Sequence, residues 1–120
     1  MSAPGVRHIS LTAGRWTSLS LVEQLANVGS EVERAIKAYQ NGQQSRWEHA
    51  TDRALELFDL TAADHRWTLA QRRETLRARE EFCRLFFAGP NEDVPSDAAD
   101  RQRRYFLQFA VVARRRVTRA

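Results

Sequence analysis

Hydrophobic positions recur every three or four residues along most of this chain. Between residues 20 and 42 the apolar stripe comprises Val22, Leu25, Gly29, Val32, Ile36 and Tyr39. A second stripe comprises Trp47, Ala50, Ala54, Leu57, Phe58 and Thr61. This spacing is typical of amphipathic helices that pack in a bundle. Outside the first twelve residues no segment alternates as a strand would, so the pattern predicts an all-α protein.

Capping residues and helix breakers divide the pattern into four helices. Ser20 with Glu23 and Ser45 with Glu48 have the spacing of a capping box, and Thr68 with Gln71 can open a third helix. Asn41-Gly42 and Gly89-Pro90 are stop signals, and Ser96 or Asp97 can cap the last helix. Because short connections make neighbouring helices antiparallel, we expect an antiparallel up-down-up-down four-helix bundle. Its expected bounds are residues 18–117, between an N-terminal tail (1–17) and a basic end (118–120).

The third helix has an interrupted stripe. Steps of three and four residues from Leu69 reach Leu76, Cys83 and either Phe86 or Phe87, but the intervening positions are charged. An antiparallel register between the second and third helices would place Asp59 opposite Arg72, Glu56 opposite Thr75, and Asp52 opposite Arg79. The acidic residues share one face of their helix. We therefore interpret the charged positions as an inter-helix ion-pair lock formed by Asp52, Glu56, Asp59, Arg72 and Arg79.

Composition and charge narrow the class of protein. The chain has 120 residues, of which 42% are hydrophobic and 28% charged, as in an ordinary single domain. Its longest uncharged apolar run, residues 105–113, is too short to cross a bilayer, and the N-terminus lacks the apolar stretch of a secretory signal. The single cysteine excludes an internal disulfide. We therefore expect a cytoplasmic protein that does not bind membranes.

The net charge of +4 is unevenly distributed. Residues 1–64 carry −2 and residues 65–120 carry +6, and every basic residue except Lys37 is arginine. Arginine suits phosphate recognition, so RNA or DNA is a possible partner. A GC-rich genome that encodes arginine in place of lysine would produce the same composition.

Patterns that carry chemistry are scarce. No Glu is followed three residues later by His, which excludes the di-iron motif of helical bundles, and the three His residues lack the Arg-His spacing of helical ribonuclease toxins. Cys83 lies on the expected apolar stripe, which favours a small core residue over a nucleophile. Glycine-rich phosphate loops are absent. A polar site at Arg77 and Glu80 inside the bundle is the one enzymatic alternative, and we expect no cofactor and no metal.

The last helix interleaves aromatic and apolar residues with arginine. Phe106, Phe109, Ala110 and Ala113 can form its core stripe. Tyr105, Leu107, Val111 and Val112 make it apolar nearly all round, which predicts contact with another subunit and a homo-oligomer. The arginines in and around this stretch are candidate phosphate ligands: Arg101, Arg103, Arg104, Arg114, Arg115, Arg116 and Arg119.

Four segments carry a family resemblance: "SLSLVEQLANVGSEVERAI", "RALELFDLTAAD", "RETLRAREEFCRLFF" and "RYFLQFAVVAR". They resemble a family of small prokaryotic helical proteins of unknown function. In general architecture the chain is also similar to the four-helix-bundle proteins related to the 23S rRNA intervening-sequence product and to the accessory proteins of diversity-generating retroelements. That similarity implies ring-like oligomers that engage nucleic acid or a reverse transcriptase.

Three functional hypotheses follow from these features. The first is a non-enzymatic accessory or scaffold protein that self-associates and binds a protein partner. The second is a nucleic-acid-binding bundle that uses the C-terminal arginines. The third is an enzyme or toxin with a polar site inside the bundle.

Overall fold

The computed structural model describes residues 14–119, with side chains described for residues 14–117, and this part of the chain is helical with no strand. The long helices are α2 (Leu21–Gln40), α3 (Gln44–Ala62), α4 (Leu69–Phe87) and α5 (Ala98–Arg119). Residues 14–16 are also helical. The predicted all-α class is confirmed. A simple four-helix bundle is not confirmed, because this additional helical segment precedes α2.

Local signals at the helix ends explain most of the boundaries. The Ser20–Glu23 and Thr68–Gln71 capping boxes are both formed, and Gly42 adopts a left-handed φ of 67° just after α2. The Ser45–Glu48 box is wrong, since α3 begins at Gln44 without a side-chain cap. The Gln43 N–H donates to the Ala38 carbonyl, so the turn closes before Ser45 is reached.

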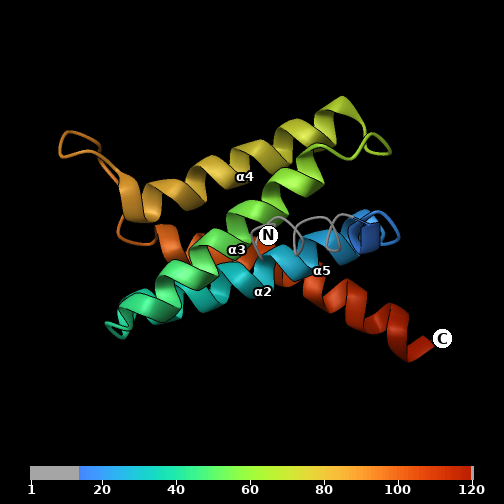
Figure 1. Cartoon of the computed structure of the whole chain (residues 1–120), viewed down its shortest axis with the longest axis horizontal. Helices are drawn as coiled ribbons and strands as arrows, with labels where there is room; N and C mark the ends of the chain where they lie inside the picture. The colour runs from blue at the N-terminus through green and yellow to red at the C-terminus, as the bar shows by residue number, and fades with distance from the viewer. Residues whose placement is uncertain (1–13, 120) are drawn as a thin grey trace, which may run out of the picture.

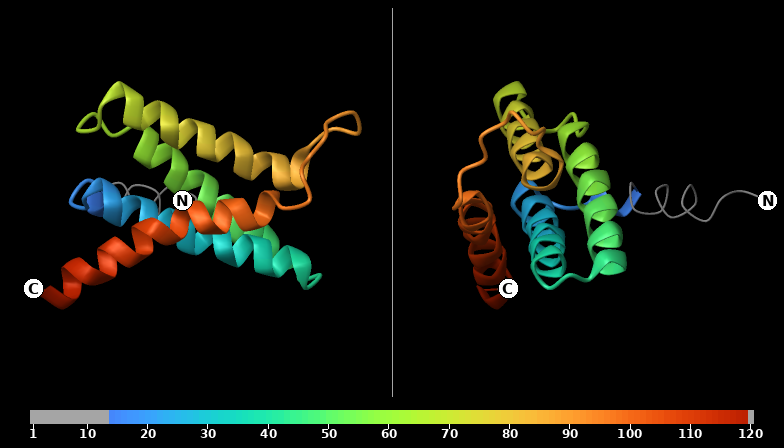
Figure 2. Two further views of the ribbon diagram at one scale, coloured as in Figure 1. Left: turned by 180° about the vertical axis from the view of Figure 1, so that it is seen from behind. Right: turned by 90° about the vertical axis from the view of Figure 1, so that its left-hand side faces the viewer.

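Helix α2 is the central element of the fold. Figure 1 shows that the chain reverses direction from each long helix to the next, and the end-on view of Figure 2 places α2 between α3 and α5. Val28, Val32 and Ile36 of α2 are buried in the core. Phe58 links the other three helices, because its ring centroid lies 5.7 Å from that of Phe82 in α4 and 5.8 Å from that of Phe106 in α5.

A close approach of backbones joins α2 to α5. A Cβ atom added to Gly29 would lie 2.6 Å from Cβ of Phe106, closer than side-chain carbons pack. Glycine in a helix costs about 1 kcal/mol of helix propensity. The absence of a side chain at Gly29 therefore permits the close crossing of α2 and α5, and Phe106 is the residue that requires it.

The inward face of α4 is not the predicted one. Leu69 and Leu76 are 60% and 49% exposed, whereas Thr75, Ala78 and Phe82 are buried. The buried stripe is thus rotated by about one residue from the stripe through Leu76 and Cys83. The charged positions that interrupted the predicted stripe do not enter the core, because that stripe lies mainly at the surface.

Ion pairing between α3 and α4 occurs in a different register from the predicted one. Arg79 Nε donates to Asp59 Oδ1 at 2.8 Å, and Arg72 Nε donates to the Ala62 carbonyl oxygen at 2.7 Å. Glu56 pairs within its own helix, with Arg53 at 3.1 Å. The predicted pairs of Asp59 with Arg72 and of Asp52 with Arg79 are therefore wrong.

The shape of the α3–α4 pair explains the shift in register. The two helices meet at their connecting loop and diverge away from it (Figures 1 and 2), and Asp59 is nearer to that loop along α3 than Asp52. An arginine side chain also leans toward the N-terminus of its own helix, which in α4 is the loop end. Arg79 therefore reaches Asp59, nearer the loop.

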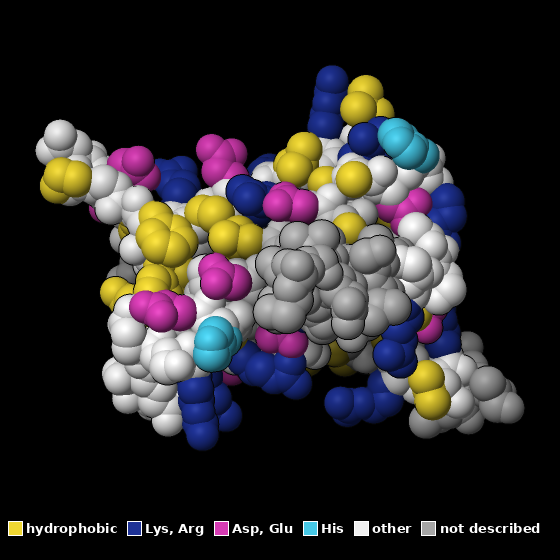
Figure 3. Space-filling model, in the orientation of Figure 1, with side chains coloured by type: hydrophobic (Ala, Val, Ile, Leu, Met, Phe, Trp, Pro, Cys, Tyr) yellow, Lys and Arg dark blue, Asp and Glu magenta, His cyan; other side chains and the backbone are white. Residues whose placement is uncertain are grey.

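Aromatic side chains fill the open end of the α3–α4 pair. Trp47 has its ring centroid 5.8 Å from Tyr39, 5.5 Å from Phe86 and 5.8 Å from Phe87. Figure 3 shows hydrophobic side chains gathered between α4 and α3 on this side of the molecule. The aromatic rings thus replace the direct helix contact that the divergence removes.

Candidate binding surfaces

The outer face of α5 exposes apolar side chains. Leu107 is 59% exposed, and Val111, Val112 and Val117 are exposed as well. The C-terminal part of α5 extends beyond the other helices (Figure 1). Three of the four predicted interface residues therefore lie at the surface.

Tyr105, the fourth predicted interface residue, is half-buried. Its ring packs on Phe106 and Phe109 at centroid distances of 5.0 and 5.4 Å. Burial, reinforced by the Glu74 carboxylate, raises the pKa of Tyr105 to about 12. Tyr105 is therefore less exposed than Leu107, Val111 and Val112.

A groove of about 530 Å³ lies beside Leu107, between α2 and α5. Its α2 wall carries the small residues Ala26, Gly29 and Ser30, and its α5 wall includes Leu107 and Ala110. Small residues allow another helix to approach closely. The surface around Leu107 thus combines an apolar projection with a neighbouring depression.

Two of the predicted phosphate-binding arginines are held by carboxylates. Arg103 donates to Glu33 at 2.8 Å and pairs with Asp100 at 3.4 Å. Arg101 pairs with Asp97 at 3.0 Å. These pairs compete with phosphate for the same guanidinium groups.

The remaining predicted arginines lie farther along α5. Arg104, Arg114, Arg115 and Arg116 are exposed on this helix. Arg119 lies in the last turn, outside the described side chains. Most of the predicted phosphate-binding arginines therefore lie at the C-terminal end of α5.

A second basic surface, between α2 and α3, was not predicted from the sequence. A groove of about 670 Å³ between α2 and α3 is lined by five basic or potentially basic side chains and one acidic residue, Glu31. The basic side chains are Arg34, Lys37, Arg46, His49 and Arg53. Arg34 and Lys37 share a face of α2, and Arg46, His49 and Arg53 share a face of α3. These spacings could have predicted the basic surface, but the total charge of residues 1–64 is negative and gave no reason to look for one there.

A buried polar cluster closes the loop end of the fold. Gln24 of α2 is 0% exposed, and its Nε2 donates to the Trp16 carbonyl oxygen at 2.9 Å and to Asp64 Oδ2 at 3.0 Å. Its Oε1 accepts from Trp67 Nε1 at 2.9 Å. Every polar atom of the Gln24 side chain therefore has a partner.

Asp64 connects this cluster to the surface. Arg66 donates to Asp64 from Nε and Nη2, and its Nη2 also donates to the Leu19 carbonyl oxygen at 2.7 Å. These hydrogen bonds from Arg66 lower the pKa of Asp64 well below its usual range, although burial opposes the shift. Because the carboxylate is fully engaged, the cluster joins the Trp16 segment and the α3–α4 loop to α2 and does not form an open reactive site.

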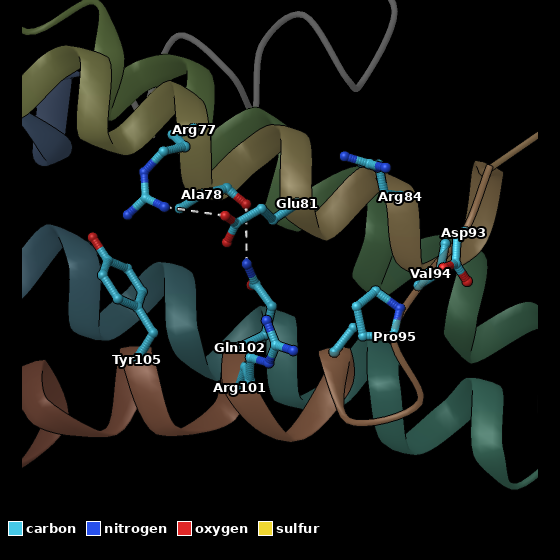
Figure 4. Close-up of a pocket in the computed structure, with 11 residues that line it drawn as sticks. Arg77, Ala78, Glu81, Arg84, Asp93, Val94, Pro95, Arg101, Gln102 and Tyr105 are labelled. Atoms are coloured by element: carbon cyan, nitrogen blue, oxygen red, sulfur yellow. Dashed lines mark hydrogen bonds and ion pairs between the residues drawn. The ribbon is translucent and has the colours of Figure 1, made fainter.

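A third groove, of about 530 Å³, lies between α4 and α5. It is lined by Arg77 and Glu81 of α4, whereas Glu80, the predicted companion of Arg77, is exposed and is not part of the lining. Arg77 pairs with Glu74 and Glu81 (the latter at 3.1 Å), and the Arg77 hydrogen bond lowers the pKa of Glu74. Figure 4 shows Arg77 and Glu81 facing Gln102 and Tyr105 across the groove.

Cys83 is half-buried beside the α3–α4 ion pair. Burial raises the pKa of its thiol above the usual range, and the nearby Arg79 only partly offsets this effect. A raised pKa disfavours the thiolate, the form in which cysteine acts as a nucleophile. The half-buried position also differs from the core position that we predicted.

The described residues contain no group of three His, Cys, Asp or Glu side chains placed to hold a metal ion. Within residues 14–119, none of the helices has both the length and the apolar character needed to cross a membrane.

Comparisons with protein-family models, with curated proteins and with solved structures find no match for this chain.

Proposed function

We propose that this protein is a non-enzymatic helical accessory or scaffold protein that self-associates through the outer face of α5 and in this state binds a partner. In this proposal the four long helices act as one antiparallel up-down-up-down unit. The observation that carries the proposal is the exposure of Leu107, Val111 and Val112 on the helix that extends beyond the rest of the fold.

The α2–α5 groove supports a second copy of the chain as the occupant of this surface. Leu107 lies beside a depression lined by Ala26, Gly29 and Ser30. Leu107 of one copy could therefore insert into the depression of a second copy. A surface with both properties can pair with itself about a two-fold axis. Burial of an exposed leucine contributes about 2 kcal/mol, and the contribution is made twice in a symmetric dimer.

Light scattering tests self-association with a matched pair of variants. Leu107 and Leu69 are almost equally exposed, at 59% and 60%, but they lie on different helices. We expect wild type and Leu69→Glu to have masses that are multiples of the 13.8 kDa chain, and Leu107→Glu to approach 13.8 kDa. A wild-type chain that stays monomeric at micromolar concentration, or equal masses for the two variants, would contradict the proposal.

Nucleic-acid binding is the second candidate function, and the basic α2–α3 groove is the observation that favours it. Lys37 and Arg46 contribute charge from opposite walls, and α3 begins beside them without a side-chain cap. Phosphate is attracted to such a combination of cations and unpaired helix N–H groups.

A titration with single-stranded RNA at two salt concentrations tests this candidate. Phosphate contacts require affinity to fall steeply as salt rises. We expect the double variant Lys37→Glu, Arg46→Glu to weaken binding more than tenfold if the groove is the site. A triple reversal at Arg114, Arg115 and Arg116 would weaken it instead if the end of α5 is the site. Binding that does not depend on salt would reject both.

A further inference from the structure

One residue that lines the groove between α4 and α5 has a buried polar atom with no partner in the described part of the chain. Gln102 is 3% exposed, and its Nε2 donates to the carbonyl oxygen of Ala78 at 3.1 Å. Among the described residues, no donor reaches its Oε1. Figure 4 shows the Gln102 side chain rising from α5 to α4 in the middle of the groove.

The orientation of this amide is determined by Ala78. An exchange of the amide nitrogen and oxygen would place two acceptors, Oε1 and the Ala78 carbonyl oxygen, against each other. The amide NH₂ therefore faces Ala78, and Oε1 is left as a buried acceptor on a residue that lines the groove. A buried acceptor of this kind is stabilised by a ligand that brings an N–H or O–H group.

The rest of the groove offers an apolar body and charged edges. Side chains of Val94, Pro95, Ala98 and Tyr105 give it an apolar lining. Its volume lies within the range of small-molecule sites, which combine apolar walls with a few placed polar groups. The ligand thus needs an apolar portion as well as a hydrogen-bond donor.

Three arginines and two acids line the same groove, and each arginine also pairs with an acid outside the lining. Arg77 is engaged by Glu74 and Glu81, and Arg101 by Asp97. Arg84 is the least engaged, since its contact with Glu92 is 3.5 Å long and both side chains are about half exposed. A guanidinium has five N–H donors, so Arg84 can bind an added carboxylate while Glu81 and Asp93 limit how much negative charge the groove accepts.

We propose that the α4–α5 groove binds an N-acyl amino acid group. Its amide N–H donates to Gln102 Oε1, its carboxylate binds Arg84 at the edge, and its side chain or acyl group packs on Pro95 and Tyr105. This chemistry occurs in free N-acyl amino acids and at the carboxyl end of a peptide chain. The site is separate from the α5 face and from the basic α2–α3 groove.

Two-dimensional NMR of the intact protein with N-benzoylglycine as the probe tests the site. The ester analogue benzoyloxyacetate, in which oxygen replaces the amide N–H, is the matched ligand control. We expect saturable shifts of the backbone amides around Ala78 and Gln102 with the amide, and binding at least tenfold weaker with the ester. Equal binding of amide and ester, or no saturable shift at these residues with either, overturns the proposal.

Protein variants locate the contacts independently. We expect Gln102→Leu to abolish the preference for the amide over the ester, and Arg84→Gln to weaken both ligands while keeping that preference. Gln108→Leu, an exposed position on the same helix, is the control and should change neither. Because Arg84 lies at the surface, its variant tests the site even where Gln102→Leu alters folding. An Arg84→Gln variant that binds the amide as well as wild type would exclude the proposed carboxylate contact.

A short peptide that ends in glycine with a free carboxyl group distinguishes the two sources of this chemistry, a free N-acyl amino acid and the carboxyl end of a peptide chain. Tighter binding of the peptide indicates a protein chain end as the natural ligand, and tighter binding of N-benzoylglycine indicates a free metabolite. Either result supports the site when the amide preference is present.

Discussion

Gln24 and Gln102 are both buried glutamines that connect two parts of the fold, but they differ in how completely they are bonded. Gln24 uses both amide N–H groups and its oxygen, with Trp16, Asp64 and Trp67 as partners. Within residues 14–117, Gln102 has one partner, the Ala78 carbonyl oxygen, and an unused acceptor. A saturated amide holds segments together, whereas the unsaturated one keeps a free acceptor, for which we propose a ligand. Burial alone does not distinguish these roles.

The largest effect is expected when the saturated glutamine is removed. Gln24→Leu leaves the Trp67 indole without its partner and removes one hydrogen bond each from Asp64 and from the Trp16 carbonyl oxygen, which keeps the Leu19 N–H at 3.1 Å. We expect a loss of about 3 kcal/mol in the free energy of unfolding, since three hydrogen bonds of about 1 kcal/mol each are lost together. Urea unfolding measures it, and a loss below about 1 kcal/mol would show that this cluster does not hold the loop end together.

A smaller effect is expected from protonation of Asp64. Its pKa is lowered in the folded state, so its contribution to stability is complete above the unfolded value near pH 4 and is lost as the pH falls through the folded value. Wild type should lose stability between about pH 5 and pH 2 more steeply than Asp64→Asn, which cannot titrate there. Parallel stability curves for the two proteins would contradict the assignment of Asp64 as the titrating group.

The smallest effect is expected from Gln102→Leu. The Ala78 carbonyl lies inside α4 and can keep its helical hydrogen bond, and the substitution also removes the unpaired acceptor. We expect the free energy of unfolding to change by less than about 1 kcal/mol in urea. A loss as large as that of Gln24→Leu would mean that the two glutamines have the same structural role.

Local features of the fold could be predicted from the sequence. The capping residues Ser20 and Thr68 and the stop at Gly42 act through neighbours a few residues away. The local sequence is therefore sufficient to predict these helix boundaries. Gly29 was also interpretable, because a glycine on an apolar stripe has few explanations other than close packing.

Features that depend on the angle between helices could not be predicted. In α4, leucines and aromatics occur on more than one face, so the spacing of Leu69 and Leu76 does not identify the side that Phe82 actually buries. The ion-pair register depended on the divergence of α3 and α4, which brings Arg79 to Asp59 and not to Asp52.

The candidate sites depend on residues from separate helices and were mostly not predictable. Gln24 and Asp64 are forty positions apart, and the local sequence around either residue does not predict its contact with the other. The basic groove likewise combines Lys37 and Arg46, whose charges belong to a segment that is acidic overall. Helical periodicity could predict that Leu107 is exposed on α5, but not the groove beside it.

The extension of α5 past its neighbours has a consequence for amide hydrogen exchange. From Arg114 to Val117 every side chain is exposed, so this turn buries little side-chain surface that would keep its amides from solvent. An isolated last turn opens readily and exchanges fast, because single helical turns are only marginally stable. Slow exchange at these amides that accelerates on dilution would therefore report a neighbouring subunit covering the end of the helix.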